Sequence, residues 1–318
     1  MSNDFPAFVA AGEALTDLIR TGPDGWRSLV GGSTWNVARV VASLGLPSAF
    51  AGAVSRDVFG AQLAAANAAA GLDGRFLQQL DKAPLLAVVH ELDPPAYFFI
   101  GDDSADLHFD AAALPPGWQA GARWVHFGGI SLARQPLSDK LLALAEELKL
   151  HGVSISYDPN FRALMDQRYD PILRRMAALA DVIKVSDEDL RGLFRTGDAD
   201  QAFAALRAMN PDAVYLYTRG EHGARIYQGA SSWSAPAPTI SVVDTVGAGD
   251  ASIGALLYSF IARPADTLEG HLGFAVAAGA AACTAPGATP PTLQQVMQLM
   301  RPIPPTSPTS PTPGKNAV

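Results

Sequence analysis

Apolar residues along the chain alternate between short runs typical of buried strands and longer stretches with helical spacing. Phe8 to Ala11 is a short apolar run that ends at Gly12, whereas Leu137 to His151 carries apolar residues at helical spacing and is closed by Gly152. The pattern predicts further strands over 49–54, 124–127, 153–157, 182–185 and 213–217, and further helices over 36–44, 59–70, 201–209, 251–262 and 272–283. Strands that alternate with helices predict an α/β fold, in which helices cover both faces of a mostly parallel sheet.

Two stretches, at about 13–31 and 84–110, break this alternation and have a β pattern with little helix. Within the second stretch, the apolar runs 85–90 and 97–100 are joined by Asp93-Pro94-Pro95, which predicts a hairpin. We interpret both stretches as a small β lid inserted into one main domain over 1–301; the alternative is that they are extra edge strands of the main sheet. Residues 302–318 are rich in Pro, Ser and Thr and are predicted to be disordered.

Composition narrows the class of protein. Of the 318 residues, 48% are hydrophobic and 17% are charged, which is ample for a large core, and the net charge of -8 argues against a nucleic-acid-binding protein. A single cysteine, Cys283, excludes an internal disulfide. The N-terminus lacks the pattern of a secretory signal, and the longest apolar run, 272–283, is too short to cross a bilayer. These features predict a cytoplasmic protein without a membrane segment.

The segment from Val242 to Ser252 carries the clearest chemistry, and it lies between an expected apolar strand and a predicted helix. Its two glycines let the backbone turn tightly, so that amides point outward at a helix N-terminus, where anions are favoured. We interpret the turn, Gly247-Ala248-Gly249, as a site that stabilises a transferring phosphoryl group. Asp250 follows in the first helical turn, and it is either a helix cap or a general base that takes the proton of an attacking hydroxyl.

Residues 244–250 read Asp-Thr-Val-Gly-Ala-Gly-Asp, and this run resembles, residue for residue, the second signature of the ribokinase-like (PfkB) sugar kinases. The resemblance covers about residues 5 to 300 and points to the fructokinase-like members. Five further segments are similar to motifs of the family: 12–17, 31–38, 52–60, 157–162 and 218–224.

The resemblance implies a three-layer αβα fold with a β lid, and it also implies roles for single residues. It makes Asp250 the catalytic base and Gly247, Ala248 and Gly249 the anion hole. It places the sugar against Asp17, Gly31, Gly32, Asn36 and Arg162, and ATP along Thr218, Gly220, Gly223 and Thr245. It further implies Mg²⁺ bound with ATP, a monovalent cation such as K⁺ near Asp244, and a homodimer formed through the lid.

Several of these residues also have a purely structural interpretation. Asp17 is alternatively an exposed strand charge, and Asn36 is alternatively the cap of the helix that it begins. Arg162 is alternatively a surface side chain with a buried stem. Gly220 and Gly223 are alternatively the glycines of a hairpin turn.

The sequence departs from the family pattern at two places. Ser186 and Asp189 stand where many members carry the Asn and Glu of Asn-x-x-Glu, and we take them as candidates for the shell of the metal ion. Before Ser104-Ala105-Asp106, the lid lacks the arginine of many relatives and carries Asp102 and Asp103 instead. Carboxylates there would repel a sugar acid, which favours a neutral sugar.

The expected activity is ATP-dependent phosphorylation of a primary hydroxyl on a small sugar, with fructose as the first candidate. Ribose, ketodeoxygluconate and nucleosides are alternative acceptors. A silent sugar or nucleotide sensor on the same scaffold is an alternative of another class. A dehydrogenase is disfavoured, because no Gly-x-Gly-x-x-Gly follows the first strand.

Overall fold

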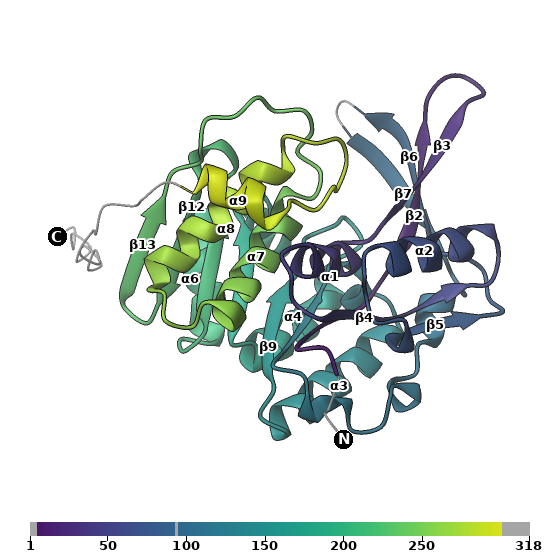
Figure 1. Cartoon of the computed structure of the whole chain (residues 1–318), viewed down its shortest axis with the longest axis horizontal. Helices are drawn as coiled ribbons and strands as arrows, with labels where there is room; N and C mark the ends of the chain where they lie inside the picture. Colours follow the sequence, from purple (N-terminus) through teal and green to yellow (C-terminus); the bar gives the residue numbers. More distant parts are fainter. Residues whose placement is uncertain (1–4, 93–94, 301–318) are drawn as a thin grey trace.

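The computed structural model describes residues 5–92 and 95–300, which form a large sheet between two layers of helices and a small second sheet (Figure 1). The tail over 302–318 and the centre of the expected hairpin, at Asp93-Pro94, lie outside the described residues. The architecture confirms the α/β fold with an inserted β lid.

The large sheet has nine strands within the described ranges, in the order β13-β12-β11-β10-β9-β8-β1-β4-β5. The strands from β11 to β5 are parallel to one another, and β12 and β13 join at one edge as antiparallel strands. Their bounds are β1 Phe8–Ala11, β4 Ser48–Ser55, β5 Leu77–Leu80, β8 Trp124–Gly128, β9 Ser154–Asp158, β10 Val182–Ser186, β11 Val214–Thr218, β12 Ala224–Gln228 and β13 Ser231–Ala235. The sheet is therefore mostly parallel, as the pattern predicts.

Two sets of helices bury the two faces of this sheet, because successive strand residues point to opposite faces. In β1, Phe8 and Ala10 pack into one apolar cluster, and Val9 and Ala11 pack into another. The helices of the first cluster are α1 Ser33–Ser43, α2 Val58–Ala69, α7 Ala248–Ala262, α8 Leu268–Ala282 and α9 Leu293–Leu299. Those of the second are α3 Leu137–Leu150, α4 Asp170–Leu179, α5 Asp187–Phe194 and α6 Ala199–Met209. None of the helices in the described part of the chain is long and apolar enough to cross a membrane.

In the part of the chain that the structure describes, four strands form the second sheet, in the order β3-β2-β6-β7, and they project away from the large sheet next to α2 (Figure 1). Their bounds are β2 Leu15–Arg20, β3 Trp26–Gly31, β6 Leu86–Leu92 and β7 Pro95–Ile100. The strands β6 and β7 pair antiparallel, which confirms the predicted pairing of 85–90 with 97–100. The alternative of extra edge strands is wrong, because these four strands pair with one another in a sheet of their own.

Some elements differ from the expected pattern. The helices α4, α5 and α9 and the strands β5, β12 and β13 were not predicted. The apolar strand expected directly before the Gly247 turn is also wrong, because residues 236–247 contain no strand and Val242 and Val243 are each 61% exposed. Pro236 and Pro238 follow the end of β13 at Ala235, and a proline has no N–H with which to continue a strand ladder.

The strand order reverses at β1, because the chain continues to β4 and β5 on one side of it and to β8 on the other. In open α/β sheets, ligands bind in the crevice at the carboxyl ends of the strands beside such a reversal. The residues that follow β1, β8 and β9 therefore lie where a ligand site is expected.

Candidate active site

The turn before α7 has the backbone geometry expected of an anion site. Gly247 has a φ of 81° and is the N-cap residue of α7, which begins at Ala248 rather than at residue 251. A Cβ on Gly247 would lie 2.8 Å from the Cα of Ala288, so that only glycine fits there without displacing its neighbour. The first amides of a helix have no carbonyl one turn earlier to bond, and the helix dipole adds partial positive charge. The turn can therefore accept an anionic oxygen.

Asp250 lies in the first turn of α7 and is 8% exposed. Its carboxylate accepts two hydrogen bonds from α1, one from Ser33 Oγ to Oδ1 at 2.7 Å and one from Asn36 Nδ2 to Oδ2 at 3.0 Å. Burial raises the pKa of Asp250, and these two donors oppose the shift. The carboxylate thus bonds across to another helix, and the interpretation of Asp250 as a simple helix cap does not describe its contacts.

The start of α1 brings its polar residues against Asp250. Gly32 is the N-cap residue of α1, and a Cβ on it would lie 2.7 Å from the carbonyl oxygen of Glu13. Asn36 lies one turn into the helix, so the interpretation of Asn36 as the cap is wrong. Its amide is instead turned to the carboxylate of Asp250. Ser33, the first residue of the helix, was missed, because a serine in this position carries no signal of its own.

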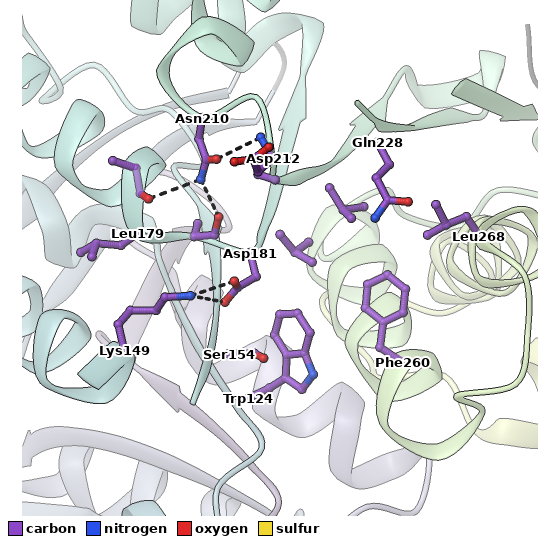
Figure 2. A pocket seen from close by; sticks show the side chains of 15 residues that line it. Trp124, Lys149, Ser154, Leu179, Asp181, Asn210, Asp212, Gln228, Phe260 and Leu268 are labelled. Atoms are coloured by element: carbon purple, nitrogen blue, oxygen red, sulfur yellow. Dashed lines mark hydrogen bonds and ion pairs between the residues drawn. The ribbon is translucent and has the colours of Figure 1, made fainter. Parts of the chain in front are cut away.

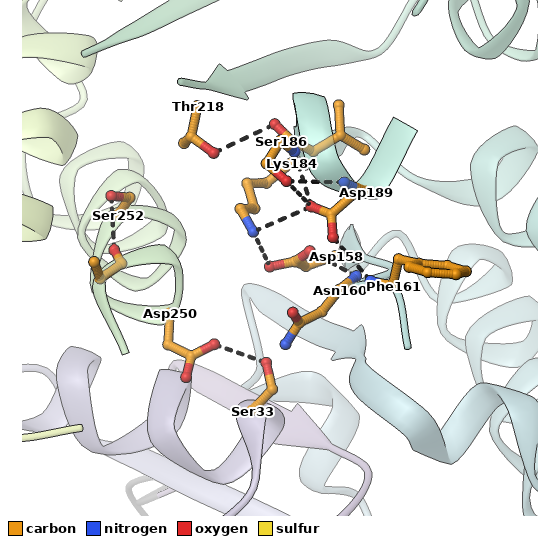
Figure 3. A network of polar contacts seen from close by, with 12 residues as sticks. Ser33, Asp158, Asn160, Phe161, Lys184, Ser186, Asp189, Thr218, Asp250 and Ser252 are labelled. Carbon is orange, nitrogen blue, oxygen red and sulfur yellow. Dashed lines mark hydrogen bonds and ion pairs between the residues drawn. The ribbon is translucent and has the colours of Figure 1, made fainter. Parts of the chain in front are cut away.

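A buried ammonium group faces the same turn, and sequence reasoning missed it as well. Lys184 in β10 is 5% exposed, and its Nζ lies 3.0 Å from Asp158 Oδ2 and 3.7 Å from Asp189 Oδ2 (Figure 3). The Nζ is also 3.1 Å from the position that a Cβ on Gly249 would take. Burial alone would lower the pKa of Lys184, but the carboxylates of Asp158, Asp189 and Asp250 outweigh burial and raise it. A full positive charge therefore lies beside the anion turn.

Ser186 and Asp189, the two candidates for the metal shell, form the capping box of α5. Asp189 Oδ2 accepts hydrogen bonds from the amide and the hydroxyl of Ser186, and Oδ1 accepts one from the amide of Phe161. In the described part of the chain, no three His, Cys, Asp or Glu side chains converge so as to hold a metal ion. Ser186 and Asp189 therefore fit a metal ion whose ligands are mainly phosphate oxygens and water, which is how Mg²⁺ is usually bound with nucleotides.

Asp17 in β2 and Arg162 after β9 are electrostatically coupled between the lid and the main domain. The Oδ2 of Asp17 lies 2.4 Å from where a Cβ on Gly31 would be, so glycine makes room for this carboxylate. Burial raises the pKa of Asp17 to about 6, and the charge of Arg162 opposes the shift. Arg162 Nη1 donates to Asn160 Oδ1 at 2.8 Å and to the carbonyl of Phe161 at 2.7 Å. Asp17 is thus half-buried rather than an exposed strand charge, and Arg162 is fixed at the strand end.

The residues expected along the nucleotide lie at the carboxyl end of β11 and in the turn that follows. Thr218 ends β11, and its Oγ1 donates to the carbonyl of Val185 at 3.5 Å. Gly220 and Gly223 form the turn from β11 to β12, and a Cβ on Gly223 would lie 2.1 Å from the carbonyl oxygen of Ala235. The hairpin interpretation therefore accounts for the geometry of both glycines, and their contact with a nucleotide stays a prediction.

Asp244 and Thr245 precede the anion turn. Asp244 accepts hydrogen bonds from the amide of Val246 at 3.0 Å and from the amide of Gly287 at 2.8 Å, which ties this segment to the loop after α8. Thr245 is exposed, and its carbonyl accepts a bond from the amide of Ala248 at 3.2 Å. The monovalent cation near Asp244 and the contact of Thr245 with ATP remain predictions.

The acidic residues after β7 are engaged by the protein itself. Exposed Asp103 forms an ion pair with Lys82 at 2.8 Å, and buried Asp106 bonds to Arg134. The charges of Asp103 and Asp106 are therefore paired within the protein, and the repulsion of a sugar acid by this segment stays a prediction.

Glu13, between β1 and the lid, is a further buried carboxyl that was missed. It is 2% exposed, and both the hydroxyl and the amide of Ser131 donate to it. Burial raises the pKa of Glu13 to about 7. An acidic residue two positions after a fully apolar strand was the available signal, because charged side chains are rarely buried unless they have partners.

A cavity of about 540 Å³ lies at the opposite, amino ends of β8 to β11 (Figure 2). Its wall includes Trp124, whose ring is stacked on Phe260 with 5.9 Å between centroids, and the ion pair of Lys149 with Asp181. None of the expected site residues lines it. The catalytic candidates therefore belong to the carboxyl edge of the sheet and not to this cavity.

Comparison with known proteins agrees with this arrangement. The sequence model of the pfkB family carbohydrate kinases matches residues 8–295. A fructokinase of Klebsiella pneumoniae is 34% identical over 290 residues, which cover 87% of this chain and 93% of the relative.

Two solved structures share the fold over nearly their whole length. A fructokinase from Xylella fastidiosa with bound ATP has a TM-score of 0.82 and 28% identity, with 92% of this chain and 98% of that chain covered. A fructokinase from Vibrio cholerae O395, in a form with bound fructose, ADP and calcium ion, has a TM-score of 0.81 and 28% identity, with 93% and 99% covered.

Proposed function

The chain belongs to the pfkB family of carbohydrate kinases, and we propose that its own reaction transfers the γ-phosphoryl group of ATP to a primary hydroxyl of fructose. The relatives named fructokinase, and their bound forms with ATP and with fructose and ADP, support this pair of substrates. The observation that carries the proposal is the meeting of Asp250, the anion turn and the Lys184 ammonium at the carboxyl edge of the sheet.

In this reaction, the sugar lies between the lid and the main domain, with Asp17, Asn36 and Arg162 as partners for its hydroxyls. Asp250 accepts the proton of the primary hydroxyl while the hydroxyl oxygen forms a bond to the γ-phosphorus. The bond from that phosphorus to the bridging oxygen breaks, and ADP leaves with the electron pair. Asp250 must be ionised for this step, and the hydrogen bonds from Ser33 and Asn36 stabilise its ionised form.

The transferring group carries negative charge that needs preorganised positive partners. The amides of Gly247 and Gly249 are backbone donors for its oxygens, whereas that of Ala248 already donates to the carbonyl of Thr245 at 3.2 Å, and Lys184 adds a full charge next to Gly249. The anion turn lies at the start of α7 and Lys184 lies in β10, so neither requires much rearrangement during the reaction.

Mg²⁺ is proposed to bind together with ATP, and when bound it neutralises charge on the phosphate oxygens. Asp189 and Ser186 would contact it through ordered water, because the oxygens of Asp189 already accept hydrogen bonds from the protein. The monovalent cation, K⁺ for example, is proposed at Asp244, in the segment that leads into the anion turn.

ADP release tests the proposed substrates directly. With Mg²⁺ and K⁺ present, we expect fructose to give a kcat/KM about tenfold or more above those of ribose, tagatose, ketodeoxygluconate and nucleosides, because hydrogen-bonding sites reject acceptors that leave polar groups unpaired. A preference for another acceptor in the panel would contradict fructose as the substrate, while the proposed kinase activity would still hold. ATP binding without turnover of any acceptor would instead favour the sensor alternative.

We also propose that the protein forms a homodimer through the outer face of the lid. Trp26, Phe98 and Ile100 lie on this face, which the strand register places opposite to that of Asp17. Their side chains are 49%, 51% and 50% exposed. Grouped apolar residues of this kind are typical of protein interfaces.

Replacing both Phe98 and Ile100 with Asp should therefore convert a dimer into a monomer, because buried unpaired carboxylates oppose association. Sedimentation velocity measures the mass, and Leu150→Asp is the matched control, since Leu150 is 89% exposed at the end of α3. The control should sediment as the wild type does. A monomeric wild type, or a double variant that still dimerises, would exclude this interface.

A further inference from the structure

Arg39 is a half-buried side chain of α1 that connects two parts of the site. Its Nη1 donates to Asn36 Oδ1 and to the carbonyl of Ala288, each at 3.2 Å. Its guanidinium also lies 4.4 Å from the centre of the Trp35 ring, where a cation–π contact holds it in place. Trp35 itself is 1% exposed and donates to Asn67 at 3.3 Å, so the platform beneath Arg39 is fixed.

The contact with Asn36 decides which way the Asn36 amide faces. An amide has a donor end and an acceptor end, and here the acceptor Oδ1 meets Arg39 while the donor Nδ2 meets Asp250 at 3.0 Å. The reversed amide would set its oxygen against the carboxylate and its NH₂ against the guanidinium, and both contacts would be lost. Arg39 therefore selects the orientation in which Asn36 donates to the base.

The contact with Ala288 fixes the loop behind the anion turn. Ala288 packs directly against Gly247, since a Cβ on that glycine would lie 2.8 Å from its Cα and Cβ. The same helix holds the loop at a second point, where Ser43 Oγ donates to the carbonyl of Pro291 at 3.0 Å. A displacement of this loop would remove the surface against which the turn is packed.

We infer that Arg39 is a positioning residue, which orients Asn36 on Asp250 and supports the loop behind Gly247. Its catalytic consequence rests on the proposed function, whereas its effect on the Asp250 carboxylate does not depend on any substrate.

The pKa of Asp250 depends on the contacts that Arg39 and Asn36 make. The charged groups that act on its carboxylate are Arg39 from α1, Arg162 from the loop after β9, Lys184 from β10 and Asp158 at the end of β9. Burial raises the pKa of Asp250, and the bond from Asn36 opposes the shift, so loss of that bond raises the pKa further. Because the base acts when ionised, turnover falls as the pH drops through this pKa, and the acid limb should move to higher pH.

The test is a titration of the Asp250 carboxyl by ¹³C NMR in the full-length protein labelled at aspartate Cγ, with Asp250→Asn to assign the signal. Arg39→Met should raise the midpoint by about one pH unit, the size expected for one lost hydrogen bond to a charged group. Arg39 also acts on Asp250 through its charge, which would persist without Asn36. The decisive comparison is therefore Arg39→Met in the Asn36→Ala background, where the additional shift should fall to about a third or less of that value.

Arg207→Met is the matched control. Arg207 also lies over an aromatic ring, 5.2 Å from the centre of Tyr227, and donates to a backbone carbonyl, but it belongs to α6 and has no part in the site. It should leave the titration unchanged. Equal shifts from Arg39→Met with and without Asn36, or no shift, would overturn the inference. If no sugar supports turnover, the proposed function fails, while the titration still decides the role of Arg39.

Discussion

Asp250→Asn should lower fructose-dependent ADP release by about 10³-fold, because a well-placed general base contributes about 10²–10⁴-fold to such reactions. The amide keeps the shape of the carboxylate but cannot take up the proton of the attacking hydroxyl. The measurement is kcat at saturating ATP, Mg²⁺ and fructose, so that weaker binding does not enter the comparison.

The same variant should be at least as stable as the wild type, which separates a lost base from a damaged fold. The folded pKa of Asp250 is raised above its unfolded value, so the wild type loses stability as the pH rises from the unfolded pKa to the folded pKa, and the loss is complete above the folded pKa. The neutral amide does not carry this cost. The unfolding temperature of the variant should therefore rise relative to that of the wild type as the pH increases above the unfolded aspartate pKa of about 4, and the difference should level off above the folded pKa. A variant that keeps more than about a tenth of the turnover would contradict the role of Asp250.

The local part of the site could be predicted from the sequence because it lies within single turns of the chain. Gly247 to Asp250 form one turn and one helix start, so their spacing in the sequence fixes their spacing in space. The role of Asn36, which is carried by the first turn of α1, was implied only by the resemblance to a known family. The role of Asp17 was likewise implied only by that resemblance, because the sequence of β2 does not indicate which face of the lid lies toward Arg162.

The partners that come from other strands could not be predicted in this way. Lys184 stands in the apolar run 182–185, where a lone lysine indicates a buried ion pair but not the identity of its partner. That partner, Asp158, comes from the neighbouring strand, and only the register of β9 and β10 brings the two together. Contacts across the sheet therefore depend on strand order, which hydrophobic periodicity does not contain.

The missed secondary structure has a related cause. The helix α5 carries Leu190, Leu193 and Phe194 at helical spacing, but it has only eight residues and begins with three carboxylates, so its apolar signal is short. The edge strands β12 and β13 carry polar residues on their exposed side and hold few of the buried residues that mark a central strand. The capping box of α5 and the pairing of β12 with β13 also stabilise these elements, and a search for apolar runs detects neither.

Lys184→Met should reduce both turnover and stability, and the two losses should have different causes. Methionine keeps the length of the side chain but removes the charge next to Gly249, so kcat should fall by about 10²-fold, as for the loss of one preorganised donor to the reacting group. It also leaves Asp158 buried and without its cation, which should lower the free energy of unfolding by about 3–5 kcal/mol.

A second substitution separates these two effects. Adding Asp158→Asn to Lys184→Met removes the uncompensated carboxylate, so chemical denaturation should show much of the stability restored, while kcat should stay low because the ammonium is still absent. Lys149→Met is the control for loss of a lysine, since its pair with Asp181 at the amino end of the strands is partly exposed and contributes about 0–1 kcal/mol. If the double variant regained turnover together with stability, Lys184 would be a structural residue, and the anion turn would act through its amides alone.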